Sequence, residues 1–189
     1  MQVAGSPSWQ IAIDQPQHLL IGLFIRDAAR LPSAHTWLPA IDPAVPREGT
    51  ITGSAAAAEQ WDRWWDRTVR STTPLWGPPF ESLQESPELR EVVATLFQQA
   101  VLWSHQRAQE HIALMIDSGR GLVETNLVAG MERDRGEPAR PFHLRISEVP
   151  CAGPHLWRVD EGHILITADL LRDHDEYVRA IAPIVQALF

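Results

Sequence analysis

The stretch Ser86–Gly119, with the sequence SPELREVVATLFQQAVLWSHQRAQEHIALMIDSG, predicts one long helix at the centre of the fold. Ser86 supplies a capping hydroxyl, Pro87 suits the first helical position, and Glu88 places an acid in the first turn. Gly119 is the expected stop just past the last helical residue. An apolar stripe at helical spacing runs along the segment and widens at its middle, formed by Leu89, Val92, Val93, Leu96, Phe97, Ala100, Val101, Leu102, Trp103, Ala108, Ile112 and Met115.

Three segments after this helix show the pattern of strands. Residues 142–146 alternate between apolar and polar side chains, as expected for a strand with one buried face. Residues 155–159 and 163–167 flank Asp160-Glu161-Gly162, which is a good hairpin turn.

The N-terminal segment predicts a second hairpin. Trp9, Ile11 and Ile13 alternate with polar or small residues, which indicates a strand. After a turn at residues 14–17, the continuous apolar run His18–Ile25 is typical of a more fully buried strand.

Two further helices are expected. Ser54 is a fair N-cap for a helix over residues 54–70. Asp173 and Glu176 form a capping box that opens a helix toward the C-terminus, and Pro183 predicts a kink or a division of that helix.

The order of these elements predicts an α+β fold, with a mainly antiparallel sheet packed against the long central helix and the C-terminal helix. The proline-containing segment 31–53 is interpreted as an ordered loop or a flap, and the prolines at 74, 78 and 79 predict a second break in the helical pattern. Residues 121–131 are ambiguous and fit a further helical piece, whereas the charged segment 132–141 predicts a surface loop. The chain has no internal repeat, low-complexity tract or obvious linker, which favours a single domain over residues 1–189.

The charge balance argues against a nucleic-acid-binding protein. The 189 residues carry 16 basic side chains, all arginine, and 24 acidic ones, for a net charge of −8. Split at residue 95, the halves hold 7 arginines with 11 acids and 9 arginines with 13 acids, so each half stands at −4. Binding to phosphates needs a concentrated basic surface instead. The absence of lysine fits the codon bias of a GC-rich bacterial genome.

The cysteine count and the N-terminus indicate a cytoplasmic protein without a membrane partner. Cys151 is the only cysteine, which excludes an internal disulfide and any zinc site with two or more thiolates. The first 17 residues lack the positive and apolar regions of a secretory signal. The apolar run Leu19–Ile25 is far shorter than the roughly 20 residues that span a bilayer.

The histidines do not predict a metal site. His105 and His111 are six positions apart, about 240° around the helix, so they do not share a face. On the C-terminal hairpin, equal distances from Glu161 place His163 opposite Val159 and His155 opposite Thr167, so these two histidines are not a cross-strand pair. We expect no metal ion and no cofactor.

Two other polar features also favour structural roles. The acids between Asp169 and Glu176 lie at a helix start, where the helix dipole favours them without a ligand. Cys151 lies in a turn with His155 four residues away, and this proximity supplies neither a general base nor an oxyanion hole.

Tryptophan is the most unusual feature of the composition, with eight residues. Trp61, Trp64 and Trp65 cluster on one predicted helix and are interpreted as a core aromatic cluster. Trp37 and Trp76 lie in the flanking loops, where exposure is more expected, and are our candidates for partner binding.

Three functional hypotheses remain open. The first is a non-catalytic interaction or accessory protein, such as a subunit, adaptor, immunity or regulatory factor of a bacterial complex. The second is a small hydrolase or transferase that uses histidine with carboxylates, with Glu110, His111, His163 and Asp169 as catalytic candidates. The third is a small-molecule-binding domain. A concave pocket with converging titratable groups would favour an enzyme, and an exposed apolar surface would favour a partner-binding protein.

Overall fold

The computed structural model describes residues 2–5, 9–46, 52–71, 80–117 and 122–189. The chain groups into two compact units. The sheet unit comprises residues 1–15, 111–149 and 153–189, and the helical unit comprises residues 16–110 and 150–152. Because this grouping does not establish whether either unit folds alone, the single domain over residues 1–189 stays a prediction.

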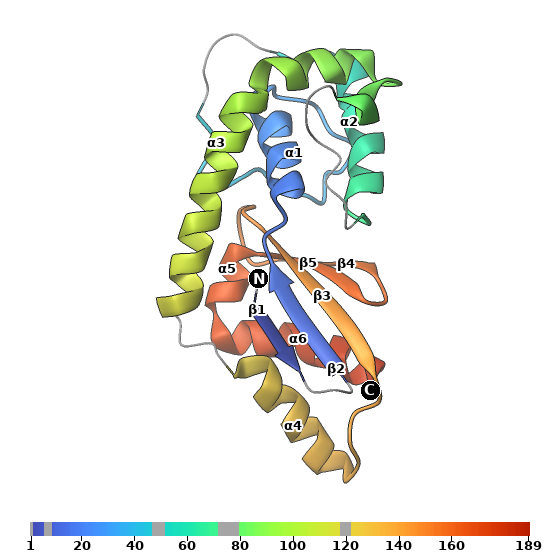
Figure 1. The fold of residues 1–189 in the computed structure, drawn as a ribbon, viewed down its shortest axis with the longest axis vertical. Coiled ribbons are helices and arrows are strands. Elements are labelled where there is room, and N and C mark those ends of the chain that lie inside the picture. The colour runs from blue at the N-terminus through green and yellow to red at the C-terminus, as the bar shows by residue number, and fades with distance from the viewer. Residues whose placement is uncertain (1, 6–8, 47–51, 72–79, 118–121) are drawn as a thin grey trace. The chain divides into compact units, whose positions relative to one another are not determined.

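The sheet unit is built on five strands in the order β1-β2-β3-β5-β4 (Figure 1). Their bounds are Gln2–Gly5 for β1, Trp9–Asp14 for β2, Phe142–Val149 for β3, Leu156–Asp160 for β4 and His163–Thr167 for β5. The outer pairs β1/β2 and β4/β5 are antiparallel, whereas β2/β3 and β3/β5 are parallel. A short turn at residues 161–162 joins β4 and β5, whereas β2 and β3 are separated in sequence by residues 15–141, which permits parallel pairing.

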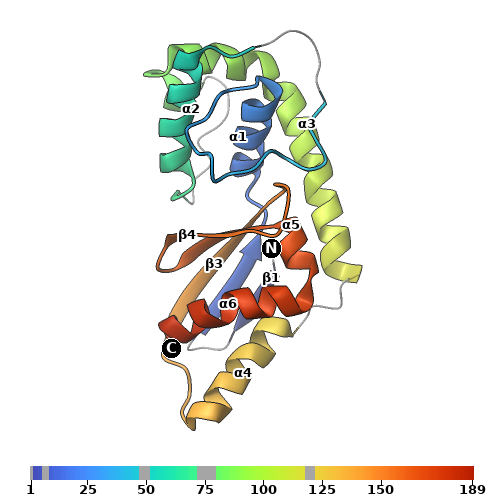
Figure 2. The ribbon, with the colours of Figure 1, turned by 180° about the vertical axis from the view of Figure 1, so that it is seen from behind.

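Three helices pack on one face of this sheet, as Figure 2 shows: α4 (Val123–Arg135), α5 (Ala168–Arg172) and α6 (His174–Leu188). Alternate residues of the strands point to this face and form an aliphatic core with the helices. Its fully buried members include Ile11, Ile13, Leu144, Ile146, Ile164, Ile166, Val128, Tyr177, Ile181 and Val185. At the start of α6 the Asp173 side chain accepts a hydrogen bond from the Glu176 backbone N–H at 2.9 Å, which confirms the predicted cap.

The helical unit contains α1 (Gln17–Ala28), α2 (Ala55–Thr68), the short 3₁₀ helix η1 (Glu81–Leu83) and the part of α3 (Pro87–Asp117) up to residue 110. Ser54 caps α2 as predicted, because its hydroxyl accepts a hydrogen bond from the Ala57 N–H at 3.1 Å. Gln60 of α2 is hydrogen-bonded to the first turn of α3. Its side-chain oxygen accepts a hydrogen bond from the Leu89 N–H at 2.8 Å.

The core of the helical unit is dominated by indole rings. Trp61, Trp64 and Trp65 are fully buried, and the rings of Trp61 and Trp65 stack with centroids 5.2 Å apart. The Trp61 indole N–H donates to the Gly22 carbonyl at 2.8 Å. Gly22 has to be glycine, since a β-carbon there would lie 2.5 Å from the Trp64 ring. The predicted aromatic core cluster is therefore confirmed.

The prediction of a strand at His18–Ile25 is wrong, because these residues lie in helix α1. Residues 18–26 are all buried, so the continuous apolar run reflects a helix covered on every side. Periodicity alone cannot separate such a helix from a buried strand. The predicted hairpin between these residues and the strand at Trp9 is therefore wrong as well, and β2 pairs with β1 instead.

The loop predicted over 132–141 begins too early, since α4 continues through Arg135. Gly136 then ends the helix with a left-handed φ of 72°. Helix α6 runs through Pro183 as one helix. The predicted stop at Gly119 lies outside the described residues.

The α+β class is confirmed, together with the long helix α3 and the C-terminal helix α6. The sheet is mixed, with two parallel pairings where a mainly antiparallel sheet was expected. None of the helices in the described ranges combines the length and the apolar character that a membrane span requires.

Candidate functional site

Four polar side chains form a hydrogen-bonded chain across the three parallel strands. Asp14 lies opposite Ser147 in the β2/β3 register, and Arg145 lies opposite His163 in the β3/β5 register. Arg145 Nη2 is 2.9 Å from His163 Nδ1, His163 Nε2 is 3.0 Å from Ser147 Oγ, and Ser147 Oγ is 3.3 Å from Asp14 Oδ1. We call these four residues the polar chain. They alternate with core residues along the strands, so they lie on the sheet face opposite to the core.

The protons of the polar chain can be placed from its donors. Arginine only donates, so His163 Nδ1 accepts from Arg145 and the ring proton sits on Nε2. His163 Nε2 then donates to Ser147, and the Ser147 hydroxyl donates to Asp14. A serine nucleophile needs the opposite polarity, with an unprotonated histidine nitrogen at the hydroxyl and a carboxylate behind the ring. The polar chain therefore does not activate Ser147, and it ties the strands together.

The β4/β5 hairpin contains a β-bulge next to His163. The register of β4 and β5 shifts between Arg158 and Asp160, which puts His163 opposite Asp160 rather than Val159. The predicted position opposite Val159 is therefore wrong. At the far end of the hairpin the His155 and Thr167 backbones are hydrogen-bonded at 3.1 Å, so the two histidines do not face each other.

Burial raises the pKa of the Asp14 carboxyl above its ordinary value of 3.8. The hydrogen bond from Ser147 and the positive charge of Arg145 oppose this shift without cancelling it. Asp14 is thus held in a place that disfavours its charged form.

His111 and Glu148 form a second buried polar group in the sheet unit. His111 Nδ1 pairs with Glu148 Oε2, and the Gln15 side-chain amide donates to Glu148 Oε1 at 3.2 Å. The side chains of His111 and Glu148 are only 6% and 3% exposed. Glu148 follows Ile146 on the core face of β3. The pair is therefore held away from bulk solvent.

The four predicted catalytic residues each have different partners. His163 belongs to the polar chain, and His111 pairs with Glu148. Glu110 is exposed and pairs with Arg107 at 2.5 Å. Asp169 accepts from the Gly153 N–H at 3.0 Å and pairs with Arg172 at 2.7 Å. Their roles stay predictions, and each has a structural partner.

Within the described ranges, no group of three or more histidine, cysteine or acidic side chains is arranged to hold a metal ion. Cys151 is buried in the helical unit, where its backbone pairs with Ile41. Burial raises the pKa of the Cys151 thiol to about 12, so the reactive thiolate is scarce at neutral pH.

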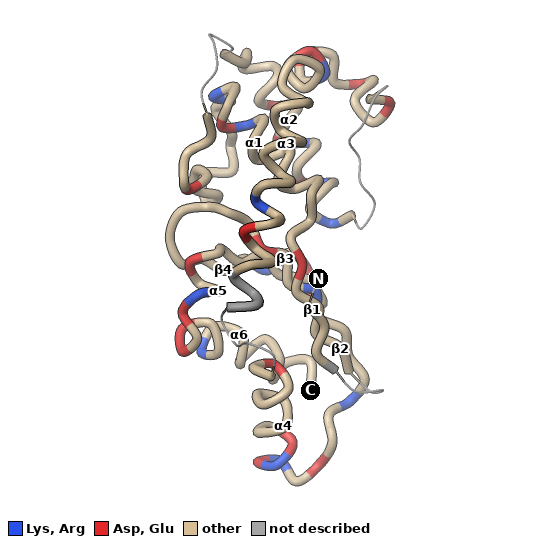
Figure 3. Tube along the Cα trace, turned by 60° about the vertical axis from the view of Figure 1, so that its left-hand side comes forward, with Lys and Arg blue, Asp and Glu red and all other residues tan. Residues whose placement is uncertain are grey.

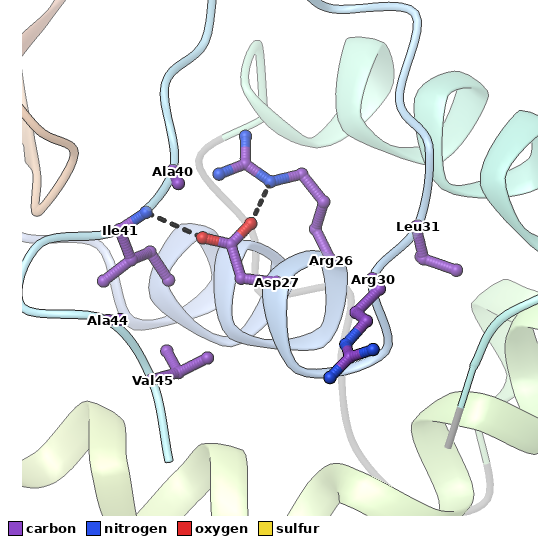
Figure 4. Close-up of a pocket in the computed structure, with 8 residues that line it drawn as sticks. All are labelled: Arg26, Asp27, Arg30, Leu31, Ala40, Ile41, Ala44 and Val45. Carbon is purple, nitrogen blue, oxygen red and sulfur yellow. Dashed lines mark hydrogen bonds and ion pairs between the residues drawn. The ribbon is translucent and has the colours of Figure 1, made fainter. Parts of the chain in front are cut away.

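The helical unit holds a long loop, residues 31–46, through buried charges. Arg26 donates from Nη1 to the Leu38 carbonyl at 3.1 Å and from Nη2 to the Pro39 carbonyl at 2.7 Å. The Asp27 carboxylate accepts hydrogen bonds from Arg26 Nε at 2.5 Å and from the Ile41 N–H at 2.7 Å, as Figure 4 shows. The middle of this loop is therefore fixed to α1.

The same loop is held to α2 near its start. The Asp62 carboxylate accepts from the Ser33 hydroxyl at 2.6 Å and from the Ala34 N–H at 2.9 Å. The His35 ring packs edge-on against Trp37, with centroids 5.5 Å apart, and against the buried Trp61 at 6.2 Å. Trp37 itself is 43% exposed. Trp76, the other predicted partner-binding residue, lies outside the described residues.

A cavity of about 250 Å³ opens between α1 and this loop. Polar and apolar surface contribute equally to its wall, and its polar lining residues are Arg26, Asp27 and Arg30. In the view of Figure 4, Ala40, Ile41, Ala44 and Val45 lie on one side of Asp27, and Arg30 and Leu31 on the other.

Comparison of the chain with models of known protein families, with curated proteins and with solved structures finds no match. The candidate sites therefore depend on the geometry of this chain alone.

Sequence reasoning missed Arg26, Asp27, Asp14, Ser147 and Glu148. A signal for the first two was present, because two charges follow directly on the apolar run of α1 and a buried charge needs a partner. Ser147 gave no such signal, since alternation with Leu144 and Ile146 is equally typical of a solvent-facing strand side. Glu148 did give one, because it continues the apolar register of Leu144 and Ile146.

Proposed function

We propose that this protein is a non-catalytic interaction or accessory protein, such as a subunit, adaptor, immunity or regulatory factor of a bacterial complex in the cytoplasm. We further propose that Trp37 is the centre of its partner-binding surface. The observation that carries the proposal is the exposure of Trp37, 43%, on a loop that buried charges hold in place.

The fixed loop supports a binding role on energetic grounds. Ordering a loop on binding lowers affinity, and a loop that is already ordered avoids this loss. Arg26, Asp27 and Asp62 together hold residues 33–41 through hydrogen bonds to their backbone or side chains. Tryptophan is the residue type most enriched among the few that dominate binding energy at protein interfaces.

The charges near Trp37 indicate the chemistry of the partner. His35, which packs on Trp37, lies 3.4 Å from a carboxylate oxygen of Asp66, and the Asp66 side chain is 66% exposed. Acidic and basic residues are interspersed along both units (Figure 3), and the whole chain carries a net charge of −8. We therefore propose a protein partner with an apolar pocket beside basic residues, rather than a nucleic acid.

The enzyme hypothesis has less support. In the polar chain His163 donates to Ser147 and cannot take its proton, and His111 is paired with Glu148 in a buried place. General acid–base catalysis requires such a group within hydrogen-bond reach of a substrate.

The test is quantitative capture of proteins from a lysate of the source bacterium on the immobilised full chain, followed by mass spectrometry. We compare the wild type with Trp37→Ala, Trp76→Ala and a matched control, Leu102→Ala, whose side chain is 70% exposed on α3. The proposal expects a stoichiometric partner that Leu102→Ala retains and Trp37→Ala loses. Equal retention by Trp37→Ala and Leu102→Ala would overturn the assignment of Trp37, and the absence of any stoichiometric partner would overturn the function.

A further inference from the structure

We propose that the cavity between α1 and the loop 31–46 binds a small monocarboxylate with a compact aliphatic body, and that Arg30 binds its carboxylate. This ligand site is independent of the partner-binding role of Trp37. Three features of the helical unit carry the proposal: the exposed Arg30 guanidinium without an ion pair, the backbone conformation of Arg30, and the size and the apolar half of the cavity wall.

The first feature is one uncompensated positive charge. Arg26 and Asp27 neutralise each other, and their hydrogen-bonding atoms are used on each other and on the backbone of residues 38, 39 and 41. Within the described part of the chain, the Arg30 guanidinium has no hydrogen bond or ion pair. The cavity therefore presents one arginine that is available to an anion. The planar fork of guanidinium donors matches a carboxylate in a bidentate manner.

The second feature is the backbone at Arg30. Helix α1 ends in a Schellman motif, because the Leu31 N–H donates to the Arg26 carbonyl at 2.9 Å and the Arg30 N–H to the Asp27 carbonyl at 3.3 Å. Arg30 occupies the left-handed position of this motif, with a φ of 50°. Glycine is the usual residue there, since a β-carbon is unfavourable in that conformation. Arg30 thus occupies a position that glycine would suit better, and its side chain lines the cavity.

The third feature is the cavity itself. Its apolar wall is formed by Leu31, Ala40, Ile41, Ala44 and Val45. At roughly 30 Å³ for each water-sized group, its volume accommodates about eight non-hydrogen atoms. A carboxylate with a chain of five further carbons fills this space. A dianionic phosphate would require more than one uncompensated cation, so a monocarboxylate suits the charge better.

The test is a titration of the full chain with hexanoate, with hexanamide as the uncharged isostere and inorganic phosphate as the competing anion. Chemical shifts in ¹⁵N-labelled protein report binding. We expect saturable hexanoate binding with a dissociation constant of about 1 mM or tighter, and a clear preference over both other probes. Arg30→Ala should weaken hexanoate binding about tenfold. Arg63→Ala, which removes an exposed arginine of α2 outside the cavity lining, should not change it.

Arg30→Gly separates binding from folding. Because glycine suits the left-handed position, this variant should unfold about 2–4 °C higher than the wild type while losing hexanoate affinity as Arg30→Ala does. The proposal is overturned if hexanoate does not saturate, if hexanamide or phosphate binds as tightly, or if Arg30→Gly keeps the wild-type affinity.

Discussion

The polar side chains of the two units differ in what they hydrogen-bond to. In the sheet unit, Arg145, His163, Ser147 and Asp14 are hydrogen-bonded to one another across adjacent strands. In the helical unit, Arg26 and Asp27 direct their hydrogen bonds to the backbone of a loop. A network of side chains bonded to one another stabilises the pairing of strands, whereas charges that hold a loop can fix the position of an exposed residue such as Trp37.

The largest effect is expected from the indole core of the helical unit. Trp61→Ala should lower the free energy of unfolding by about 4 kcal/mol, because it removes a fully buried ring and its hydrogen bond to Gly22. Trp37→Ala should lower it by much less, about 1 kcal/mol, because that ring is 43% exposed and only partly covered, by His35 among others. Urea unfolding followed by circular dichroism measures both. Equal losses would show that Trp37 belongs to the core and would remove the contrast between the two residues.

The next effect concerns the buried pair of the sheet unit. Glu148→Leu should destabilise the protein by about 3 kcal/mol, since it leaves the buried His111 and the Gln15 amide without their acceptor. The double variant His111→Leu, Glu148→Leu should recover most of this loss, because no unpaired buried polar group then remains at these two positions. A double-mutant cycle from urea unfolding gives the coupling free energy between His111 and Glu148. Additive losses would mean that the two side chains do not interact.

A smaller effect is expected in the polar chain. Ser147→Ala should cost about 1–3 kcal/mol, because His163 Nε2 and Asp14 Oδ1 both lose the hydrogen bond to the Ser147 hydroxyl. A fluorophosphonate probe, which reacts with activated serines, should leave Ser147 unlabelled in the wild type. Labelling that Ser147→Ala abolishes would contradict the structural role and revive the enzyme hypothesis.

The smallest effect is the pH dependence of Asp14. Because burial raises its pKa above 3.8 in the folded state, the folded protein binds this proton more tightly than the unfolded chain does. Its contribution to stability is therefore complete below pH 3.8 and declines as the pH rises through the raised value. Asp14→Asn should gain stability over the wild type at pH 7, by less than about 1 kcal/mol because Asp14 is only partly buried, and this gain should vanish near pH 3.

Thermal unfolding of the wild type and of Asp14→Asn from pH 3 to pH 7 measures the difference in stability between them. A gain that grows toward low pH would mean that the Asp14 carboxylate is stabilised in the folded state, in the manner of a salt-bridged acid.

The sequence predicts the elements that local chemistry determines. Ser86 and Pro87 mark the start of α3, Asp173 caps α6, and the spacing of the tryptophans on α2 indicates a buried stripe. Helix α1 escapes prediction because a helix buried on all sides has no polar face to reveal its period.

The candidate sites depend on long-range neighbours. Ser147 meets Asp14 only because β2 and β3 pair in parallel across the inserted helical unit. Arg26 meets residues 38 and 39 through the path of a loop that has no periodicity. Such contacts follow from strand order and loop path, which one sequence does not encode in any local pattern.

The most direct test of a binding role for Trp37 and a structural role for the polar chain uses one purified partner, identified by the capture experiment. Its affinity is measured for Trp37→Ala and for Ser147→Ala. Isothermal titration at a temperature where both variants are folded gives the two dissociation constants. We predict that Trp37→Ala raises the dissociation constant about 30-fold, and that Ser147→Ala lowers stability without changing affinity. Loss of binding in Ser147→Ala with full binding in Trp37→Ala would contradict the account and move the functional surface to the sheet unit.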